Sequence, residues 1–246
     1  MRFEGKSALV TGAASGIGKA VATMLATEGA ARLVLVDADD DALGGLSFGC
    51  EVQKIVGSVA DPELWSNVDL GPLDHAVINA GVAGAGLIAD LDFDEWRRML
   101  SVNLDGAFLS MQAALRSMRD GGSIVAVASA AGLKAEPGVS AYGSSKAGLI
   151  QLARVAAKES AGRRIRVNAI APGGVETPVW DAVPMFADRA REIGRDAAFA
   201  ELASMATPLG RYATAEEIAE QIAFLLSDQA ATITGSVLMS DGGYTL

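Results

Sequence analysis

Residues 7–18 read SALVTGAASGIG, a run typical of a buried strand followed by a glycine-rich turn and the first residues of a helical pattern. The glycines of this turn follow the spacing G-x-x-x-G-x-G and are Gly12, Gly16 and Gly18. Glycine at a strand–helix junction permits a sharp turn and lets the backbone approach a pyrophosphate closely. The N–H groups and partial positive charge of a helix N-terminus favour phosphate binding. The stretch therefore predicts a dinucleotide-binding unit, in which Ser15 and Ile17 complete the turn.

An acidic residue ends the next strand-like run. Asp37 lies nineteen residues beyond Gly18, where a carboxylate can accept hydrogen bonds from an adenosine ribose and would repel a 2′-phosphate. Neither Ser15 nor Ala38 supplies the cationic side chain that a 2′-phosphate would need, and three aspartates follow at 39–41. The sequence therefore predicts NAD rather than NADP as the cofactor.

The chain alternates short β-rich runs with longer helical patterns, which is typical of a parallel sheet covered on both faces. The predicted strands span residues 7–11, 32–37, 51–56, 75–79, 123–128, 164–170 and 236–239. The predicted helices span 16–28, 93–100, 104–118, 142–160 and 215–226, with Gly29 and Gly162 as left-handed caps after two of them. No repeat or linker divides the sequence, so we expect one domain over residues 1–246. The long irregular stretch, approximately 177–210, is predicted to be a lid over the substrate site.

The composition excludes several classes of protein. The 246 residues include 20 Lys and Arg against 30 Asp and Glu, a net charge of −10, which disfavours binding to nucleic acid or to anionic membranes. One Cys and one His are too few for a zinc site, so we expect no bound metal. The single histidine, His75, begins a predicted buried strand and is interpreted as structural, which leaves the G-x-S-x-G at 45–49 without a hydrolase triad. A charged N-terminus and the lack of a long apolar run predict a soluble, cytoplasmic protein.

Six motifs in a fixed order carry a resemblance to a known family. Tyr142 and Lys146 form a Y-x-x-x-K pattern. The other motifs are the glycine turn at 11–18, Asn79-Ala80-Gly81, Asn103, Ser129 and Pro172-Gly173. With this order and spacing the chain resembles the short-chain dehydrogenase/reductase family almost from end to end, down to Asp241-Gly242-Gly243. The resemblance implies a single-domain, doubly wound (Rossmann) α/β fold, with a parallel seven-stranded sheet in the order 3-2-1-4-5-6-7 and helices on both faces.

The chemistry of the Y-x-x-x-K pair agrees with this resemblance. Tyr142 and Lys146 are one helical turn apart and share a face of their helix. A free tyrosine has a pKa near 10, and a lysine cation within about 4–6 Å is expected to lower that pKa by a unit or more. The positive charge of an oxidised nicotinamide would act in the same direction. Tyr142 could then exchange a proton with an alcohol or ketone, while Ser129, just after a predicted strand, could hydrogen-bond the developing alkoxide.

Further roles are implied by the resemblance alone. Lys146 would also hold the nicotinamide ribose, and the backbone carbonyl of Asn103, at a break between two helices, would hold a water that connects Lys146 to solvent. The other implied cofactor contacts are the backbone N–H of Ile17, the adenosine-side residues Asn79, Ala80 and Gly81, and Pro172, Gly173, Val175 and Thr177 over the carboxamide. Ser58, followed by Val59, replaces the aspartate that the family usually places beside adenine, which leaves that contact open. The short connections between 37 and 79 predict stunted helices.

The expected substrate site lies among three loops that follow strand ends. The residues assigned to it are Val82, Ala131, Val139, Trp180, Met185 and Phe186, a partly apolar set. Three lid arginines, at 189, 191 and 195, leave an anionic substrate open. By resemblance, helices 104–118 and 142–160 would form a dimer bundle and the last strand would pair dimers into a homotetramer. The alternative is that both helix faces pack within the monomer.

Together these features predict an oxidoreductase that transfers a hydride between NAD(H) and a small secondary alcohol or ketone. Two alternatives stay open: an NADPH-dependent 3-oxoacyl-thioester reductase, and a non-catalytic protein that senses NAD and regulates a partner. Asp37 argues against the first alternative, and the presence of both Tyr142 and Lys146 argues against the second.

Overall fold

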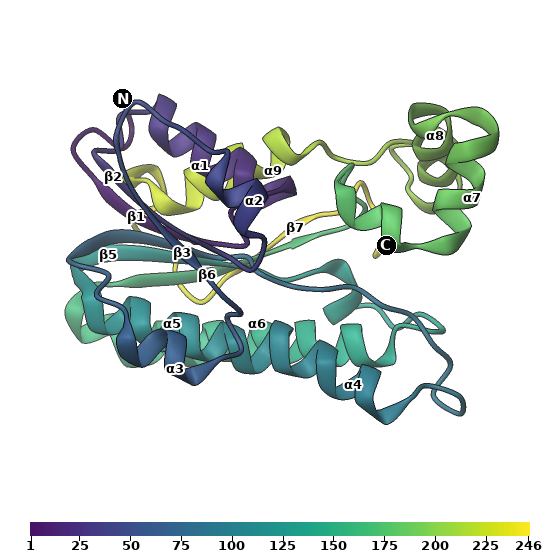
Figure 1. Ribbon diagram of the computed structural model, residues 1–246, viewed down its shortest axis with the longest axis horizontal. Helices are drawn as coiled ribbons and strands as arrows, with labels where there is room; N and C mark the ends of the chain where they lie inside the picture. The colour runs from purple at the N-terminus through teal and green to yellow at the C-terminus, as the bar shows by residue number, and fades with distance from the viewer.

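Seven parallel strands form one sheet in the computed structural model, which describes residues 1–246 apart from the side chains of Ala182 and Pro184. The strands are β1 (Ser7–Thr11), β2 (Arg32–Asp37), β3 (Glu51–Val56), β4 (Leu73–Ile78), β5 (Met118–Val127), β6 (Arg166–Pro172) and β7 (Val237–Ser240). Their order is β3-β2-β1-β4-β5-β6-β7 (Figure 1). Strands β2 and β3 are added to one side of β1 and the later strands to its other side, so the strand order reverses between β1 and β4. The predicted doubly wound fold is confirmed. Such sheets bind ligands at the carboxyl ends of the strands where the order reverses.

Helices cover both faces of the sheet (Figure 1). One face carries α1 (Gly16–Thr27), α2 (Asp40–Gly44) and α9 (Ala215–Leu226). On the other side lie α3 (Pro62–Asn67), α4 (Phe93–Leu100), α5 (Gly106–Ser117) and α6 (Ser140–Ser160). Two more helices, α7 (Pro184–Ile193) and α8 (Arg195–Ala206), lie beyond one end of the strands and belong to the stretch predicted as a lid. Among the described residues, no helix is both long enough and apolar enough to cross a membrane.

Most element boundaries lie within two residues of their predicted positions. The first three strands, α4 and α9 begin and end where predicted, whereas β5 starts five residues earlier than expected. Gly29 is left-handed as predicted, at φ +94°. The expectation for Gly162 is wrong, because the chain continues as a short 3-10 turn after α6 and Arg164 takes the left-handed conformation instead, at φ 56°. The helices α2 and α3 have five and six residues, which confirms the stunted connections.

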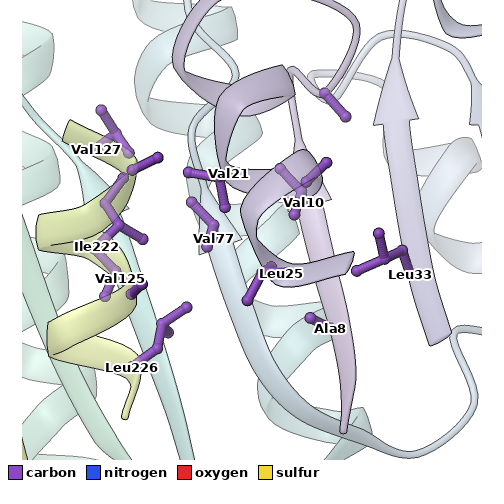
Figure 2. Packing of buried hydrophobic residues seen from close by; sticks show 14 of the residues in the cluster. Ala8, Val10, Val21, Leu25, Leu33, Val77, Val125, Val127, Ile222 and Leu226 are labelled. Atoms are coloured by element: carbon purple, nitrogen blue, oxygen red, sulfur yellow. The ribbon is translucent and has the colours of Figure 1, made fainter. Parts of the chain in front are cut away.

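The sheet buries an apolar layer on each face. Successive side chains of a strand point to opposite faces. In β1, Ala8 and Val10 therefore join the layer under α1 and α9, while Leu9 joins the layer formed with α5 and α6. Figure 2 shows the first layer, which brings together Val21, Leu25, Leu33, Val77, Val125, Ile222 and Leu226. Burial on both faces explains why inner strands such as β1, β2 and β6 read as mostly continuous apolar runs.

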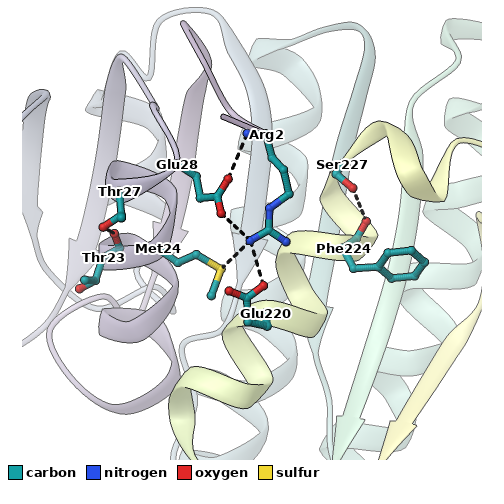
Figure 3. A network of polar contacts seen from close by, with 8 residues as sticks. All are labelled: Arg2, Thr23, Met24, Thr27, Glu28, Glu220, Phe224 and Ser227. Carbon is teal, nitrogen blue, oxygen red and sulfur yellow. Dashed lines mark hydrogen bonds and ion pairs between the residues drawn. The ribbon is translucent and has the colours of Figure 1, made fainter.

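An ion-pair network ties the N-terminal residues to both helices of the first layer. Arg2 contacts Glu28, which follows α1, at 2.8 Å and Glu220 of α9 at 2.9 Å (Figure 3). Hydrogen bonds from Arg2 lower the pKa of the Glu28 carboxyl to about 2. The network therefore joins α1 to α9 at the protein surface through one guanidinium group.

His75 has the structural role that the sequence indicated. Its Nδ1 lies 2.8 Å from Ser123 Oγ, and that hydroxyl donates to the carbonyl oxygen of Leu226 at 2.8 Å. Because the single hydroxyl proton of Ser123 is used in this way, Nδ1 of His75 carries a proton and donates it to Ser123. Burial lowers the pKa of His75 to about 4. The neutral ring thus links β4, β5 and the end of α9.

We expect His75 to make the stability of the fold depend on pH. An unfolded histidine titrates near pH 6.5, and folded His75 titrates near 4, so the unfolded chain binds the proton first as the pH falls. The stabilisation is complete above about pH 6.5 and is lost toward pH 4, with a loss of about 2 to 3 kcal/mol. Urea unfolding at neutral pH and near pH 4.5 should show this loss in the native chain. The loss should be smaller in His75→Asn, whose amide keeps a donor to Ser123. Equal losses in both chains would contradict this assignment.

Candidate active site

The turn between β1 and α1 leaves no room for a side chain at its glycine positions. Gly12 and Gly16 take positive φ angles of +65° and +49°. A Cβ on Gly12 would lie 2.8 Å from the amide nitrogen of Asn79, and a Cβ on Gly18 would lie 1.9 Å from the Gly12 carbonyl oxygen. The close approach of β1, α1 and the end of β4 therefore requires glycine at these positions.

Thr11 and Asn79 hold this turn against the end of β4. Thr11 Oγ1 accepts the backbone N–H of Asn79 at 3.0 Å and that of Ala80 at 3.1 Å. Asn79 Nδ2 in turn donates to the carbonyl oxygens of Thr11 and Gly12 at 3.0 and 3.1 Å. These bonds join the two strands between which the sheet order reverses. Sequence reasoning missed the anchoring role of Thr11, for which a hydroxyl directly before the first glycine was the available signal.

The turn and its surroundings fit a dinucleotide. Asp37 accepts the N–H of Ala14 at 2.8 Å and that of Asp39 at 3.1 Å, so its carboxylate is fixed beside the turn. Each carboxylate oxygen keeps a lone pair that can accept a ribose hydroxyl. Among the contacts that the structure describes, the Ser15 side chain does not cap α1. The N–H groups of the first turn, including that of Ile17, can therefore bind a phosphate.

The adenine side departs from the family pattern in the structure as it does in the sequence. Ser58 is exposed, and Val59 is buried. A Cβ on Gly106 of α5 would lie 2.7 Å from Val59 Cγ2, so Val59 packs against α5 as part of the core. Asp61 caps α3 by accepting the N–H of Glu63 at 2.9 Å. Asp61 therefore does not replace the aspartate that is missing at position 58.

A π-helical break between α4 and α5 carries Asn103. The break spans Ser101–Asp105, and the Asn103 side chain is fully buried. Its amide clamps Val82: Oδ1 accepts the Val82 N–H at 2.7 Å, and Nδ2 donates to the Val82 carbonyl at 2.9 Å. Nδ2 also donates to Ser145 Oγ at 3.1 Å, and that hydroxyl donates to the Tyr142 carbonyl at 2.7 Å. The predicted break is confirmed, and Ser145, which sequence reasoning missed, links Asn103 to the helix of Tyr142.

Lys146 is buried at the carboxyl edge of the sheet. Lys146 is only 4% exposed. Its Nζ donates a hydrogen bond of 2.9 Å to the carbonyl of Val127, the last residue of β5. A Cβ on Gly81 would lie 3.3 Å from Lys146 Nζ and 3.2 Å from Asn103 Oδ1, so these three residues converge. Burial lowers the pKa of Lys146 to about 8, because the charged form loses hydration.

Tyr142 and Ser129 lie next to this lysine. The Lys146 Nζ is 5.8 Å from the centre of the Tyr142 ring. Ser129 is buried, and its Oγ accepts the N–H of Ala131 at 3.2 Å. Burial raises the pKa of the Tyr142 phenol, and hydrogen bonding to Ser129 partly offsets the rise. The expected lowering of this pKa is therefore not produced by the chain's own residues, because desolvation of the phenolate outweighs the hydrogen bond to Ser129.

The segment that follows β6 reaches the glycine turn. A Cβ on Gly16 would lie 3.3 Å from Thr177 Cγ2. The carbonyl of Val175 accepts the indole N–H of Trp180 at 2.9 Å, which ties this segment to the lid. The expected carboxamide contacts lie in order along it and are Pro172, Gly173, Val175 and Thr177. Of this set, the structure places Thr177 against the α1 N-terminus.

The lid stretch has a small apolar core of its own. Trp180 stacks on Tyr212 with ring centres 5.5 Å apart, and Phe186 packs against Phe199 at 4.4 Å. Phe186 is fully buried in this cluster, so the expectation that it faces the substrate is wrong: it supports the lid. Met185 is exposed. The remaining residues assigned to the substrate site are half-buried and are Val82, Ala131, Val139 and Trp180.

The lid arginines are engaged inside the lid. The pairs are Arg189 with Glu192 and Glu201, Arg191 with Asp188, and Arg195 with Asp181. Arg195 also donates to the Thr177 carbonyl at 2.9 Å, and its guanidinium lies 5.1 Å from the centre of the Phe199 ring. Arg195 therefore holds the lid to the segment after β6. These ion pairs weigh against the lid arginines as ligands of an anionic substrate.

Known proteins resemble this chain over nearly its whole length. A family model described as enoyl-(acyl carrier protein) reductase matches residues 12–245. The 3-oxoacyl-[acyl-carrier-protein] reductase FabG of Thermotoga maritima is 38% identical over 259 residues, covering 100% of both chains. The cis-4-hydroxycyclohexanecarboxylate dehydrogenase of Sinomonas cyclohexanicum is 40% identical over 256 residues, covering 99% of this chain and 98% of the relative. The crystal structure of levodione reductase matches with a TM-score of 0.88 at 34% identity, covering 98% of each chain.

The chain belongs to the short-chain dehydrogenase/reductase family, and it is an oxidoreductase. This confirms the resemblance on which the motif analysis relied.

The tight packing of the glycine turn predicts a specific sensitivity to substitution. In Gly18→Ala the new Cβ would collide with the Gly12 carbonyl and approach Asn79 Nδ2 at 2.7 Å. We expect a loss of about 2 kcal/mol in the free energy of unfolding, measured by urea unfolding. NADH binding, measured by fluorescence titration, should weaken about tenfold or more, because the N–H groups that are expected to bind the phosphates move.

Gly44→Ala is the matched control. A Cβ at Gly44, in α2, meets nothing within 4 Å. This variant should keep NADH affinity and gain up to about 1 kcal/mol from the better helix former. Unchanged stability and unchanged NADH affinity in Gly18→Ala would show that the turn is not the cofactor cradle.

Proposed function

We propose that this chain is an NAD-dependent alcohol dehydrogenase or ketone reductase that acts on a neutral secondary alcohol or ketone. The observation that carries the proposal is the convergence of Ser129, Tyr142 and the buried Lys146 at the carboxyl edge of the sheet, where the glycine turn also lies. A phenol and a hydroxyl beside a buried cation suit proton exchange with a substrate oxygen.

Each residue has a distinct part in the proposed reaction. Bound nicotinamide supplies the carbon that accepts or donates the hydride. Ser129 Oγ hydrogen-bonds the substrate oxygen and stabilises its developing charge. Tyr142 Oη takes up the hydroxyl proton during oxidation and returns it during reduction. The Lys146 ammonium stabilises the phenolate form of Tyr142 and would hold the nicotinamide ribose. The backbone carbonyl of Asn103 would hold a water through which protons pass between Lys146 and solvent.

The cofactor preference rests on Asp37. Its carboxylate is fixed at the end of β2 by two backbone N–H groups, in the place where a ribose hydroxyl of NAD would be bound. A 2′-phosphate there would face the charge of Asp37. The other contacts proposed for NAD are those of the glycine turn, of Ser58 and Val59, of Asn79, Ala80 and Gly81, and of the segment from Pro172 to Thr177.

The substrate class rests on the lid. Its arginines are paired with carboxylates of the lid itself. Among the residues assigned to the substrate site, Met185 is an exposed apolar side chain. The net charge of −10 also disfavours a substrate that is attached to an acidic carrier protein, because the two proteins would repel each other. A 3-oxoacyl-thioester reductase remains the second candidate, favoured by the similarity to the FabG protein of Thermotoga maritima.

We also propose that the protein works as a cytoplasmic homotetramer built as a dimer of dimers. The outer faces of α5 and α6 support the dimer part of this proposal, because Phe108 and Val155 are exposed there, at 48% and 41%. An exposed phenylalanine and valine on neighbouring long helices are the kind of surface that a second copy covers.

Replacing the proposed acid/base group should stop the reaction without loosening the cofactor. We expect Tyr142→Phe to lower kcat about a thousandfold in a screen of linear and cyclic secondary alcohols and ketones. NADH affinity, measured by fluorescence titration, should stay within about twofold, because the lost hydroxyl serves proton transfer. A variant that keeps most of its turnover would refute the proposed role. NADH binding by the native chain without turnover of any compound in the panel would instead favour the NAD-sensing alternative.

The cofactor preference is tested by a charge change at the end of β2. We expect kcat/KM for NADH to exceed that for NADPH by about a hundredfold or more, since like charges brought together cost several kcal/mol. Asp37→Ser should lower this ratio by about tenfold or more, whereas Asp40→Ser, at an exposed position of α2, should leave it nearly unchanged. A native preference for NADPH would overturn the NAD assignment and favour the thioester reductase.

A further inference from the structure

The C-terminal segment, residues 241–246, is folded into a compact turn. Asp241 accepts the N–H groups of Gly243 and Thr245, both at 3.0 Å, and the Thr245 hydroxyl at 2.6 Å. Burial raises the pKa of the Asp241 carboxyl, but these hydrogen bonds outweigh burial and leave that pKa below its usual value. Figure 1 shows this end of the chain beside the lid helices, at the edge of the sheet that carries the site.

One side of the turn packs on the chain that returns from the lid. The N–H of Leu209 donates to the Gly242 carbonyl at 3.1 Å. A Cβ on Gly243 would lie 2.9 Å from the Pro208 ring, and a Cβ on Gly242 would lie 3.2 Å from the Thr207 side chain. Both glycines also have positive φ angles, +63° and +86°. The turn and residues 207–209 therefore form one closely packed unit.

The other side of the turn contacts the loop between Ser129 and Tyr142. Lys134 Nζ donates to the Tyr244 carbonyl at 2.8 Å and lies 4.2 Å from the centre of the Tyr244 ring. The same ammonium is 3.4 Å from Glu136. Burial and the neighbouring Glu136 carboxylate raise the pKa of Tyr244 to about 12, so its phenol stays neutral. We call the cluster of Lys134, Glu136 and Tyr244 the clasp.

The clasp acts on the middle of that loop, whose two ends are fixed by other contacts. Near the start, a Cβ on Gly132 would lie 2.8 Å from the Lys146 carbonyl carbon, so the backbone is pressed against α6. Near the end, the Gly138 carbonyl accepts the N–H of Gly86 at 2.8 Å. Between these anchors Leu133 is 49% exposed. The position of the middle of the loop relative to the lid therefore depends on the clasp.

We propose that the clasp couples the returning lid segment to the loop between Ser129 and Tyr142, and that it thereby sets the size of substrate the site accepts. The specificity part of this proposal rests on the proposed function. Lys134 and Tyr244 are positioning residues, since they contact the loop and the C-terminal turn rather than the catalytic side chains. With the clasp formed, the loop and the lid are held at one separation. With the clasp broken, the loop becomes mobile, and substrate binding must supply the free energy that orders it.

Hydrogen exchange of the full-length protein tests the coupling without any substrate. Lys134→Met removes the ammonium and keeps the apolar stem, and Tyr244→Ala removes the ring that the ammonium faces. We expect exchange in peptides covering 130–139 and 205–212 to become about tenfold faster in Lys134→Met and somewhat less so in Tyr244→Ala. Tyr244→Phe keeps the ring and the carbonyl acceptor and should exchange like the native chain. Lys6→Met, at an exposed position just before β1, is the matched control and should also be unchanged.

Steady-state kinetics then test the specificity role. In Lys134→Met the KM for a small cyclic ketone should rise about fivefold while kcat stays within about twofold, because Ser129 and Tyr142 are held by β5 and α6. NADH affinity should not change. Selectivity should shift toward bulkier ketones, and Tyr244→Phe should keep the native KM.

The outcomes separate the clasp from the proposed function. Native-like exchange at both segments in folded Lys134→Met and Tyr244→Ala would overturn the coupling. Faster exchange with an unaltered KM and an unaltered size preference would overturn the specificity role. Faster exchange in a protein whose native form binds NADH but turns over no alcohol or ketone would uphold the coupling and refute the proposed function.

Discussion

The burial of the Lys146 ammonium is the constraint on which the rest of the site depends. A buried cation is costly unless a polar group accepts its hydrogen bonds, and here the Val127 carbonyl at the end of β5 does so at 2.9 Å. That acceptor is within reach because α6 lies tightly against the loop after β5, where a Cβ on Gly132 would lie 2.8 Å from the Lys146 backbone. The apolar layer under α5 and α6 holds the helix at this distance. Sheet packing and site chemistry are thus joined through one side chain.

The same burial sets the protonation states of the site. It lowers the pKa of Lys146 to about 8 and raises the pKa of Tyr142, since each charged form loses hydration. Near neutral pH the chain's own residues therefore hold Tyr142 as a phenol, which is the form that donates a proton to a ketone. A positive charge added at the site favours the phenolate, which is the form that accepts a proton from an alcohol. In the proposed reaction, the positive charge of oxidised nicotinamide would favour the phenolate, and the reduced cofactor would leave Tyr142 as the phenol.

Local sequence patterns were sufficient for the features that depend on local physics. The strand, turn and helix at 7–27 follow from an apolar run and from glycines that fit no side chain. Tyr142 and Lys146 lie together because four residues make one helical turn. Tertiary features were not predictable in this way. The sequence around Phe186 is compatible both with a side chain that lines the substrate pocket and with one that fills the core of the lid. The full burial of Phe186 in the structure shows that it fills the core of the lid. The raised pKa of Tyr142 likewise depends on burial, which the spacing of Tyr142 and Lys146 does not encode.

The stabilising contacts of the lid are separate from those of the site residues, so a single domain can support the proposed substrate region without constraining the rest of the site. The aromatic cluster of the lid and its ion pairs are formed within residues 177–212, so they add stability there without involving Ser129 or Tyr142. The lid is joined to the rest through a few contacts, among them the indole N–H of Trp180 to the Val175 carbonyl and Tyr212 against Gly174. Under the proposed function, substitutions at exposed lid positions such as Met185 would alter what the site accepts while leaving Lys146 and the sheet unaffected. The proposed function thus assigns catalytic geometry and substrate choice to different packed units of the same chain.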